Sequence, residues 1–319
     1  MTTLADLAEL VRAPAALSVP GDVVAGAAAA GALGPRTPAL AGASVLLYWA
    51  GMAANDWADR QLDAVERPER PIPSGRVTPT AALGLAAGLT AAGVGLAAAV
   101  GGRRAAALAV PLAASIWGYD LLAKNTAAGP AVMAACRGLD VLLGASGGRL
   151  ARALPSAATV AAHTWTVTAL SRREVSGADA ALPMRTLAGT AVVAASAAVA
   201  VPGARRSAHP GARPAADLEA GRTDGRADAR AGRAWSTGIA AALPAALAGW
   251  YAARYGAAQA QVVRDPSAPK VRAAVGAGIT GLPALQGALT ARGGAGLLGL
   301  AVAAAAPLGR RLARKVSPT

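Results

Sequence analysis

The segment Asn55–Asp63, with the sequence NDWADRQLD, directly follows an apolar run at residues 40–54. The chain has 17 acidic residues in 319, and Asp56, Asp59 and Asp63 all fall within this segment. On a helix, this spacing predicts that the three carboxylates lie on one face. Carboxylates crowded at the end of an apolar helix repel one another and are costly to desolvate. A divalent cation would remove the repulsion. Magnesium suits such a site because it leaves positions open for phosphate oxygens.

Basic residues follow the acidic segment in the sequence RPERPIPSGR of residues 67–76. Guanidinium groups bind phosphate through paired hydrogen bonds. We therefore expect Arg67 and Arg70 to hold phosphates from the side opposite the metal. A solvated helix end is the simpler explanation for a single aspartate after an apolar helix. Three spaced aspartates followed by two Arg-Pro pairs favour a binding site.

The pattern resembles the first aspartate-rich motif of the UbiA superfamily of intramembrane prenyltransferases. That motif reads Asn-Asp-x-x-Asp-x-x-x-Asp, followed by an Arg and an Arg-Pro-(apolar)-x-x-Gly segment. The matching residues here are Asn55, Asp56, Asp59, Asp63, Arg67, Arg70, Pro71 and Gly75. The resemblance implies magnesium-dependent transfer of a prenyl group from an allylic prenyl diphosphate to a small acceptor, most often aromatic. It implies catalytic and metal-binding roles for Asp56, Asp59 and Asp63, and substrate binding by Asn55, Arg67 and Arg70.

Apolar runs recur along the chain. Hydrophobic residues make up 54% of the sequence and charged residues 15%, whereas soluble domains are about one quarter charged. Runs of about 17–25 apolar residues can span a bilayer as helices. We predict an all-α, polytopic membrane helical bundle around a central cavity, in one domain over residues 1–319. The apolar runs give ten candidate transmembrane helices, whereas the family resemblance implies nine. The candidate spans are residues 13–34, 38–57, 80–101, 104–122, 129–148, 155–171, 183–202, 235–256, 272–291 and 294–309.

The net charge of +14 raises the question of nucleic-acid binding. The arginines fall mostly between the apolar runs, which is typical of loops that flank membrane spans. We therefore predict an integral, multi-pass protein of the cell membrane with no nucleic-acid partner. The positive charges of the loops do not settle which end of the bundle faces the cytoplasm, because basic loops occur on both sides. The family resemblance places the acidic segment on the cytoplasmic side. Residues 202–233 form one long polar insertion, which we interpret as a flexible surface loop.

A second polar segment, residues 171–179, follows the sixth apolar run, as the second aspartate-rich motif does in the resembling family. Glu174 and Asp179 are its acidic residues, where the family usually has more. These two carboxylates are candidate ligands of a second magnesium ion. Arg172 and Arg173 are candidate diphosphate ligands that could take over part of a metal's role. Basic residues at a helix end are the alternative.

Further candidates lie at the end of the fourth run or within later runs. The family often has a Tyr and then a Lys in the connection where this chain has Tyr119 and Lys124. This implies substrate binding by Tyr119 and a catalytic role for Lys124, with a membrane-anchoring lysine as the alternative. Arg137 and Asp140 share a helix face inside an apolar run, where they either form an ion pair or bind substrate. His163 either orients or deprotonates the acceptor or is a hydrogen-bonded residue of the bundle.

The predicted partners are a prenyl diphosphate donor, a small-molecule acceptor and membrane lipids. A different class remains open, namely a non-catalytic prenyl-lipid-binding or transport protein with the same fold. Paired broken helices in two matching halves would favour a transporter, and no clear internal repeat is visible. Magnesium-dependent release of diphosphate would distinguish an enzyme from both alternatives.

Overall fold

The computed structural model describes residues 2–13, 18–179, 181–199 and 242–305. Within these residues the regular secondary structure is entirely helical, as predicted. The predicted polar loop at 202–233 lies outside the described residues. The helices include α1 (Leu4–Leu10), α2 (Pro20–Ala30), α3 (Arg36–Ala58), α4 (Arg60–Glu66), α5 (Pro79–Gly118), α6 (Gly129–Gly144), α7 (Leu150–Ser171), α8 (Ala181–Ala198), α10 (Ala257–Arg264) and α11 (Ala268–Arg292), with π-helical turns at Tyr119–Ala123 and Ala252–Gly256 and a 3-10 turn at Ala145–Gly147. Residues 242–251 and 296–305 are helical as well.

The long helix α5 is a hairpin of two helical halves. Gly102 breaks it with a φ of 67° and a ψ of −159°, a left-handed conformation that glycine adopts without a Cβ penalty. The Trp117 indole nitrogen donates to the Thr90 hydroxyl at 3.0 Å, so the two halves run side by side in opposite directions. The sequence predicted this division, with separate spans at residues 80–101 and 104–122.

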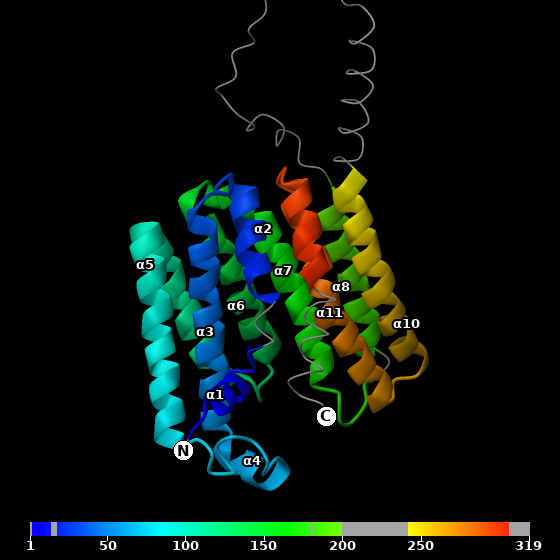
Figure 1. The fold of residues 1–319 in the computed structure, drawn as a ribbon. Helices are drawn as coiled ribbons and strands as arrows, with labels where there is room; N and C mark the ends of the chain where they lie inside the picture. Colours follow the sequence, from blue (N-terminus) through cyan, green and yellow to red (C-terminus); the bar gives the residue numbers. More distant parts are fainter. Residues whose placement is uncertain (1, 14–17, 180, 200–241, 306–319) are drawn as a thin grey trace, which may run out of the picture.

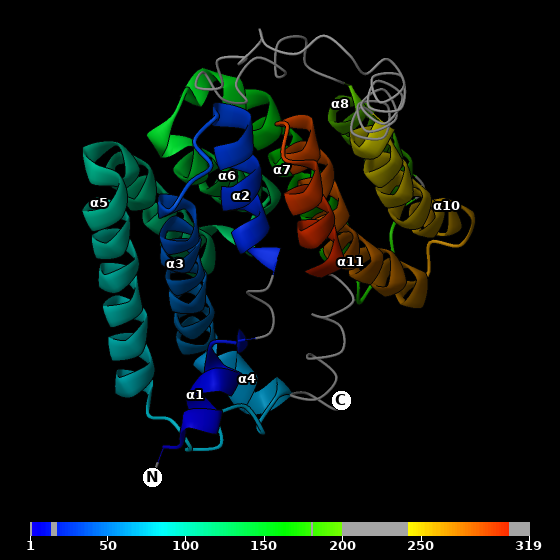
Figure 2. The same cartoon turned by 45° about the horizontal axis from the view of Figure 1, so that its top comes forward.

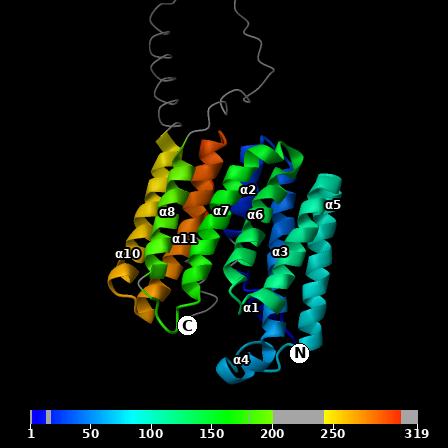
Figure 3. The ribbon, with the colours of Figure 1, turned by 180° about the vertical axis from the view of Figure 1, so that it is seen from behind.

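The long helices run roughly along one bundle axis (Figure 1). Seen from behind, α3 and α5 lie at one side, α8 and α10 at the other, and α2, α6, α7 and α11 between them (Figure 3). The short helices α1 and α4 lie together at one end of the bundle (Figures 1 and 2). The connections after α5 and after α7 also reach this end (Figure 1), which gathers the polar segments there.

Small residues allow the central helices to approach closely. A Cβ added at Gly26 of α2 would lie 1.8 Å from the Val141 carbonyl oxygen of α6, and one at Gly144 of α6 would lie 2.0 Å from the Val23 carbonyl oxygen. Neither position can accept a side chain without separating the helices. Such contacts between small residues are typical of helix packing in membranes, where close van der Waals contact drives association.

Three helical segments in the described residues are long and apolar enough to cross a membrane: Arg36–Ala58, Pro79–Ala123 and Ala181–Ala198. The shorter segment Gly296–Ala305 is also apolar. The predicted span at residues 13–34 is shorter as a helix, because α2 begins at Pro20 and ends at Ala30. The total of nine or ten spans stays a prediction.

Candidate functional site

The acidic segment lies where α3 ends and α4 begins. Asp59 caps α3 with a φ of −87° and a ψ of 1°, and α4 starts at the next residue. Its backbone nitrogen still donates to the Asn55 carbonyl at 2.9 Å, and its carbonyl accepts from the Asp63 nitrogen at 2.8 Å. The chain therefore bends at Asp59 without losing its helical hydrogen bonds.

Asp56 and Asp63 converge on the guanidinium of Arg70. One nitrogen of Arg70, Nη1, lies 2.6 Å from Asp63 Oδ2 and 3.4 Å from Asp56 Oδ1. Both carboxylates are buried, with 4% and 2% of their surface exposed. Arg12 reaches Asp56 Oδ1 at 2.7 Å, and Arg67 lies 3.8 Å from Asp63 Oδ1. Two buried carboxylates thus share one cation and each has a further basic neighbour.

Asp59 forms an ion pair with a different cation, Lys124. Lys124, in the connection after α5, contacts Asp59 Oδ1 at 2.5 Å and Asn55 Oδ1 at 3.3 Å. The Asn55 side-chain nitrogen donates to the other Asp59 oxygen at 3.3 Å. The structure therefore brings Asn55, Asp59 and Lys124 together, whereas Asp56 and Asp63 contact Arg70. The expectation that the three aspartates share one helical face stays a prediction.

The donor chemistry suits a divalent cation. Within the described residues, no three Asp, Glu, His or Cys side chains gather as a ready-made metal cluster. Instead, oxygens of Asp56 and Asp63 both point at Arg70 Nη1, and oxygens of Asn55 and Asp59 both point at Lys124 Nζ. Each pair of oxygens already faces a positive charge. Magnesium prefers such oxygen ligands, so these residues fit the ion at either nitrogen's position.

A cavity of about 250 Å³ adjoins the acidic segment. It lies between α3, the second half of α5 and α6, and Asn55 and Arg12 bring the polar site to its wall. Its lining residues are Arg12, Tyr48, Gly51, Met52, Asn55, Ile116, Tyr119, Asp120, Met133 and Cys136. The predicted substrate-binding residues Asn55 and Tyr119 therefore border the same cavity.

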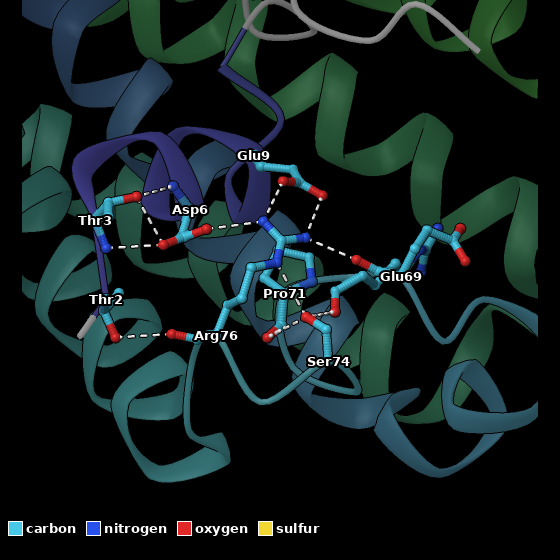
Figure 4. A network of polar contacts seen from close by, with 9 residues as sticks. Thr2, Thr3, Asp6, Glu9, Glu69, Pro71, Ser74 and Arg76 are labelled. Carbon is cyan, nitrogen blue, oxygen red and sulfur yellow. Dashed lines mark hydrogen bonds and ion pairs between the residues drawn. The ribbon is translucent and has the colours of Figure 1, made fainter.

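Arg76 ties α1 to the loop that carries Arg70 (Figure 4). Its Nη1 lies 2.8 Å from Asp6 Oδ1 and 2.7 Å from Glu9 Oε2, and its Nη2 donates to Glu9 Oε1 at 3.0 Å. The Nη2 group also donates to the Glu69 carbonyl at 2.7 Å. Arg12 follows α1 directly and holds a φ of 46°, a conformation that is unusual for a residue with a side chain. The Arg76 contacts therefore help to hold Arg12 over Asp56.

Comparison with known protein families identifies the family of this chain. The model of the UbiA prenyltransferase family matches residues 18–204, more than half of the chain. This chain belongs to that family. The match confirms the resemblance drawn from the acidic segment and assigns the chain to a family of prenyltransferases.

Curated relatives within the UbiA family share one name. A digeranylgeranylglyceryl phosphate synthase of Natronomonas pharaonis is 34% identical over 191 residues, which cover 59% of this chain and 69% of that protein. The synthase of the same name from Methanothrix thermoacetophila is 57% identical over 49 residues, which cover 15% of this chain and 18% of the relative. The matched segments therefore span well under two thirds of some of these relatives.

Two solved structures share the UbiA fold. One is described in terms of digeranylgeranylglyceryl phosphate synthase in membranes. It has a TM-score of 0.58 and 14% identity, and the match covers 90% of this chain and 97% of that one. A UbiA homologue from Aeropyrum pernix K1 has a TM-score of 0.51 and 19% identity, with 83% and 96% covered. At these identities the likeness supports the fold of the helical bundle.

In the second polar segment of this UbiA chain, the Asp179 side chain caps α8 and the Glu174 backbone contacts Arg272. Asp179 Oδ1 accepts from the Leu182 backbone nitrogen at 2.8 Å, which places it at the start of α8. Burial raises the pKa of Glu174, and Arg272 opposes that shift. Arg272 also donates to the Glu174 carbonyl at 2.8 Å. Neither carboxylate joins the first acidic segment in a metal cluster of the described residues.

Arg172 and Arg173 take different positions. Arg172 donates to the Thr126 carbonyl and lies 3.4 Å from the Lys124 carbonyl oxygen, so it braces the connection that carries Lys124. Arg173 is exposed. The structure thus links Arg172 to the first site through the backbone beside Lys124.

Arg137 and Asp140 do not pair with each other as their spacing suggested. Arg137 Nε lies 2.7 Å from Asp22 Oδ2 on α2, whereas Asp140 accepts from the Ser44 hydroxyl on α3. Gln286 of α11 donates to Asp22 Oδ1 at 2.6 Å. A spacing of three residues places two side chains on one face but does not select partners, and closely packed α2 brings Asp22 nearer to the guanidinium.

His163 is a hydrogen-bonded residue of the bundle. Its Nδ1 lies 2.8 Å from the Tyr251 hydroxyl, and its ring meets those of Tyr251 and Tyr255 edge to face. It is fully enclosed by these contacts and is not among the residues that line the cavity beside Asn55.

Sequence reasoning assigned no function to several residues at or near this site. Arg12 and Asp120 line the cavity, and Gln286 completes the buried contact to Asp22. The family pattern offered no match to flag Asp120, although it directly follows the predicted Tyr119. A rare acidic residue at the end of an apolar run was the available signal.

Proposed function

We propose that this chain transfers a prenyl group from an allylic prenyl diphosphate to a hydroxyl of a glyceryl phosphate acceptor, in a magnesium-dependent reaction within the membrane. The observation that carries the proposal is the cluster of paired carboxylates and basic side chains that adjoins one cavity, whose wall includes Arg12 and Asn55. Family membership and the shared name of the curated relatives support the same chemistry.

The acidic residues would hold the metal. Asp56 and Asp63 are the first candidates because their oxygens already converge on one nitrogen of Arg70, and Asn55 with Asp59 form the second candidate position. Magnesium bound at these oxygens supplies concentrated positive charge for a departing diphosphate.

The basic residues would hold the diphosphate. Arg70, Arg12 and Lys124 neutralise the carboxylates in this structure. With a metal held by the carboxylates, these side chains would be available to donate to phosphate oxygens. Positive groups aimed at the diphosphate stabilise the charge that develops as the allylic C–O bond breaks. The cavity wall of Met52, Ile116 and Met133 keeps water from the allylic cation.

The acceptor is the finer part of the proposal. The relatives' name, digeranylgeranylglyceryl phosphate synthase, denotes a product with two geranylgeranyl groups on glyceryl phosphate. It favours an acceptor that presents a hydroxyl and a phosphate. The aromatic acceptor expected from the family resemblance stays a prediction, and a direct competition between the two acceptor classes decides between them.

The location is proposed on the same grounds. We place the chain in the cell membrane, with the end that carries α1 and α4 facing the cytoplasm. Glu66 on α4 is exposed at that end, and Cys136 is buried. A Glu66→Cys variant should react with an impermeant maleimide only after intact cells are opened. Labelling in intact cells would reverse the orientation.

A transfer assay tests the function. Membranes that contain the protein are incubated with labelled geranylgeranyl diphosphate, magnesium and geranylgeranylglyceryl phosphate, and the product is identified. We expect transfer by the wild type, loss of transfer with EDTA, and loss in Asp56→Ala and Asp59→Ala. Asp265→Asn, at an exposed loop position, is the matched control and should retain activity.

Two outcomes would contradict the proposal. Full activity in both the Asp56 and Asp59 variants would remove the acidic segment from the reaction. Binding of the prenyl donor without magnesium-dependent release of diphosphate would instead favour a non-catalytic prenyl-lipid-binding or transport protein.

A further inference from the structure

Asp120 is a buried carboxylate in the wall of the cavity. It lies in the π-helical turn Tyr119–Ala123 that ends the second half of α5, and 6% of its surface is exposed. It shares the lining with Arg12 and Asn55, which belong to the polar site. A carboxylate in such a place is costly to bury, and π-helical turns inside helices often occur at functional sites.

Asp120 differs from the other carboxylates of the site in its partners. Asp56 contacts Arg12 and Arg70, Asp63 contacts Arg70, and Asp59 contacts Lys124. For Asp120, no side-chain hydrogen bond or ion pair forms with any residue that the structure describes. The three paired aspartates contact cations, whereas Asp120 lines the cavity without such a contact among the described residues.

A glycine on the facing helix makes room for this carboxylate. A Cβ added at Gly51 of α3 would lie 3.4 Å from Asp120 Oδ2 and 2.5 Å from Ile116 Cγ2. Gly51 also lines the cavity. The absence of a side chain at position 51 therefore lets the turn that carries Asp120 approach α3 and leaves space beside its carboxylate.

The proposed reaction needs a proton acceptor at this place. When a hydroxyl attacks the allylic carbon, its oxygen supplies the electron pair of the new C–O bond. The old C–O bond breaks, and its electron pair leaves with the diphosphate. The hydroxyl proton must then leave the oxygen, and a carboxylate that forms no direct ion pair is a suitable base.

We propose that Asp120 is a further catalytic residue, the general base that accepts the proton of the acceptor hydroxyl. The proposal rests on the proposed function, because it requires a hydroxyl acceptor. The acidic residues of the site then have two separate roles. Asp56, Asp59 and Asp63 serve the metal and the diphosphate, and Asp120 serves the acceptor.

The first test compares Asp120→Asn with the wild type in two assays. Transfer to geranylgeranylglyceryl phosphate in a single turnover should fall by about 10²–10⁴-fold, the usual contribution of a general base. Magnesium-dependent binding of geranylgeranyl diphosphate should stay within roughly two-fold, since that binding uses the other aspartates. The Asp265→Asn variant is the control and should match the wild type in both assays. Loss of donor binding in Asp120→Asn would overturn the proposal, because Asp120 would then serve the metal or the diphosphate.

The second test replaces the acceptor hydroxyl by a thiol. A thiol has a pKa of about 8.5 and ionises without much help, so the deficit of Asp120→Asn should shrink to roughly ten-fold or less if the lost group is a base. The Asp120→Glu variant, which keeps a carboxylate, should retain more transfer than Asp120→Asn with the hydroxyl acceptor. An equal deficit with both acceptors would overturn the proposal, as would near wild-type transfer by Asp120→Asn. Failure of the wild type to transfer to any hydroxyl acceptor would refute the proposed function, and the role of Asp120 with it.

Discussion

Replacing Arg70 by glutamine should destabilise the folded protein, and added magnesium should restore part of the lost stability. Arg70 is 19% exposed at its side chain and lies between Asp56 and Asp63, which are 5% and 2% exposed at theirs. Removal of one partner of a buried ion pair typically costs about 3–5 kcal/mol, because the other charge stays buried without compensation. Arg12 remains on Asp56 and Arg67 remains near Asp63, so we expect a loss of about 2–3 kcal/mol.

The matched control is Arg67→Gln. Arg67 is 52% exposed and lies 3.8 Å from Asp63, and exposed pairs of this kind contribute about 0–1 kcal/mol. Thermal unfolding of both variants and the wild type is measured in detergent, first with EDTA and then with excess magnesium. Arg70→Gln should melt several degrees below Arg67→Gln with EDTA. Magnesium should stabilise Arg70→Gln more than the wild type, because the ion no longer competes with Arg70 for the same oxygens. Equal stabilisation by magnesium, or equal melting of the two variants with EDTA, would refute this reasoning.

Two further predictions concern the N-terminal helix and the cavity wall. Hydrogen bonds from the Thr3 hydroxyl and backbone, followed by Arg76, lower the pKa of Asp6 from 3.8 to about 2. Its stabilising effect on α1 is therefore close to complete above pH 4 and is lost as the pH falls through 2. Pepsin should cleave α1 faster in Asp6→Asn than in the wild type at pH 4, and the difference should shrink as the pH falls through 2; a difference that stays the same from pH 4 to pH 2 would be inconsistent with this pKa. Gly51→Ala would place its Cβ 2.5 Å from Ile116 Cγ2, so α3 and α5 must shift apart. Single-turnover transfer should then fall roughly 10-fold or more. Unchanged transfer would count against the cavity as the reaction site.

The helices of this chain were largely predictable because each depends on a local pattern. Apolar runs set the helical segments, and the paired glycines at positions 101 and 102 marked the break that Gly102 makes in α5. The acidic segment was recognisable because few acidic residues occur elsewhere. Its placement at the end of a helix beside a cavity follows from the same pattern.

The partners of the charged side chains were not predictable, because they come from distant parts of the sequence. Asp56 pairs with Arg12, 44 residues away, and Asp59 with Lys124, 65 residues away. Arg137 pairs with Asp22 of α2 and not with Asp140 of its own helix, α6. Spacing determines which face a side chain occupies, whereas tertiary packing determines what it meets there.

Crystallography can show where the metal binds. Manganese is an electron-rich substitute for magnesium, and its anomalous signal can be measured in crystals grown with a non-reactive analogue of geranylgeranyl diphosphate. We predict a manganese peak coordinated by Asp56 and Asp63, at the place that Arg70 Nη1 occupies in this structure. Diphosphate bound with no manganese at any of Asp56, Asp59 and Asp63 would contradict the account.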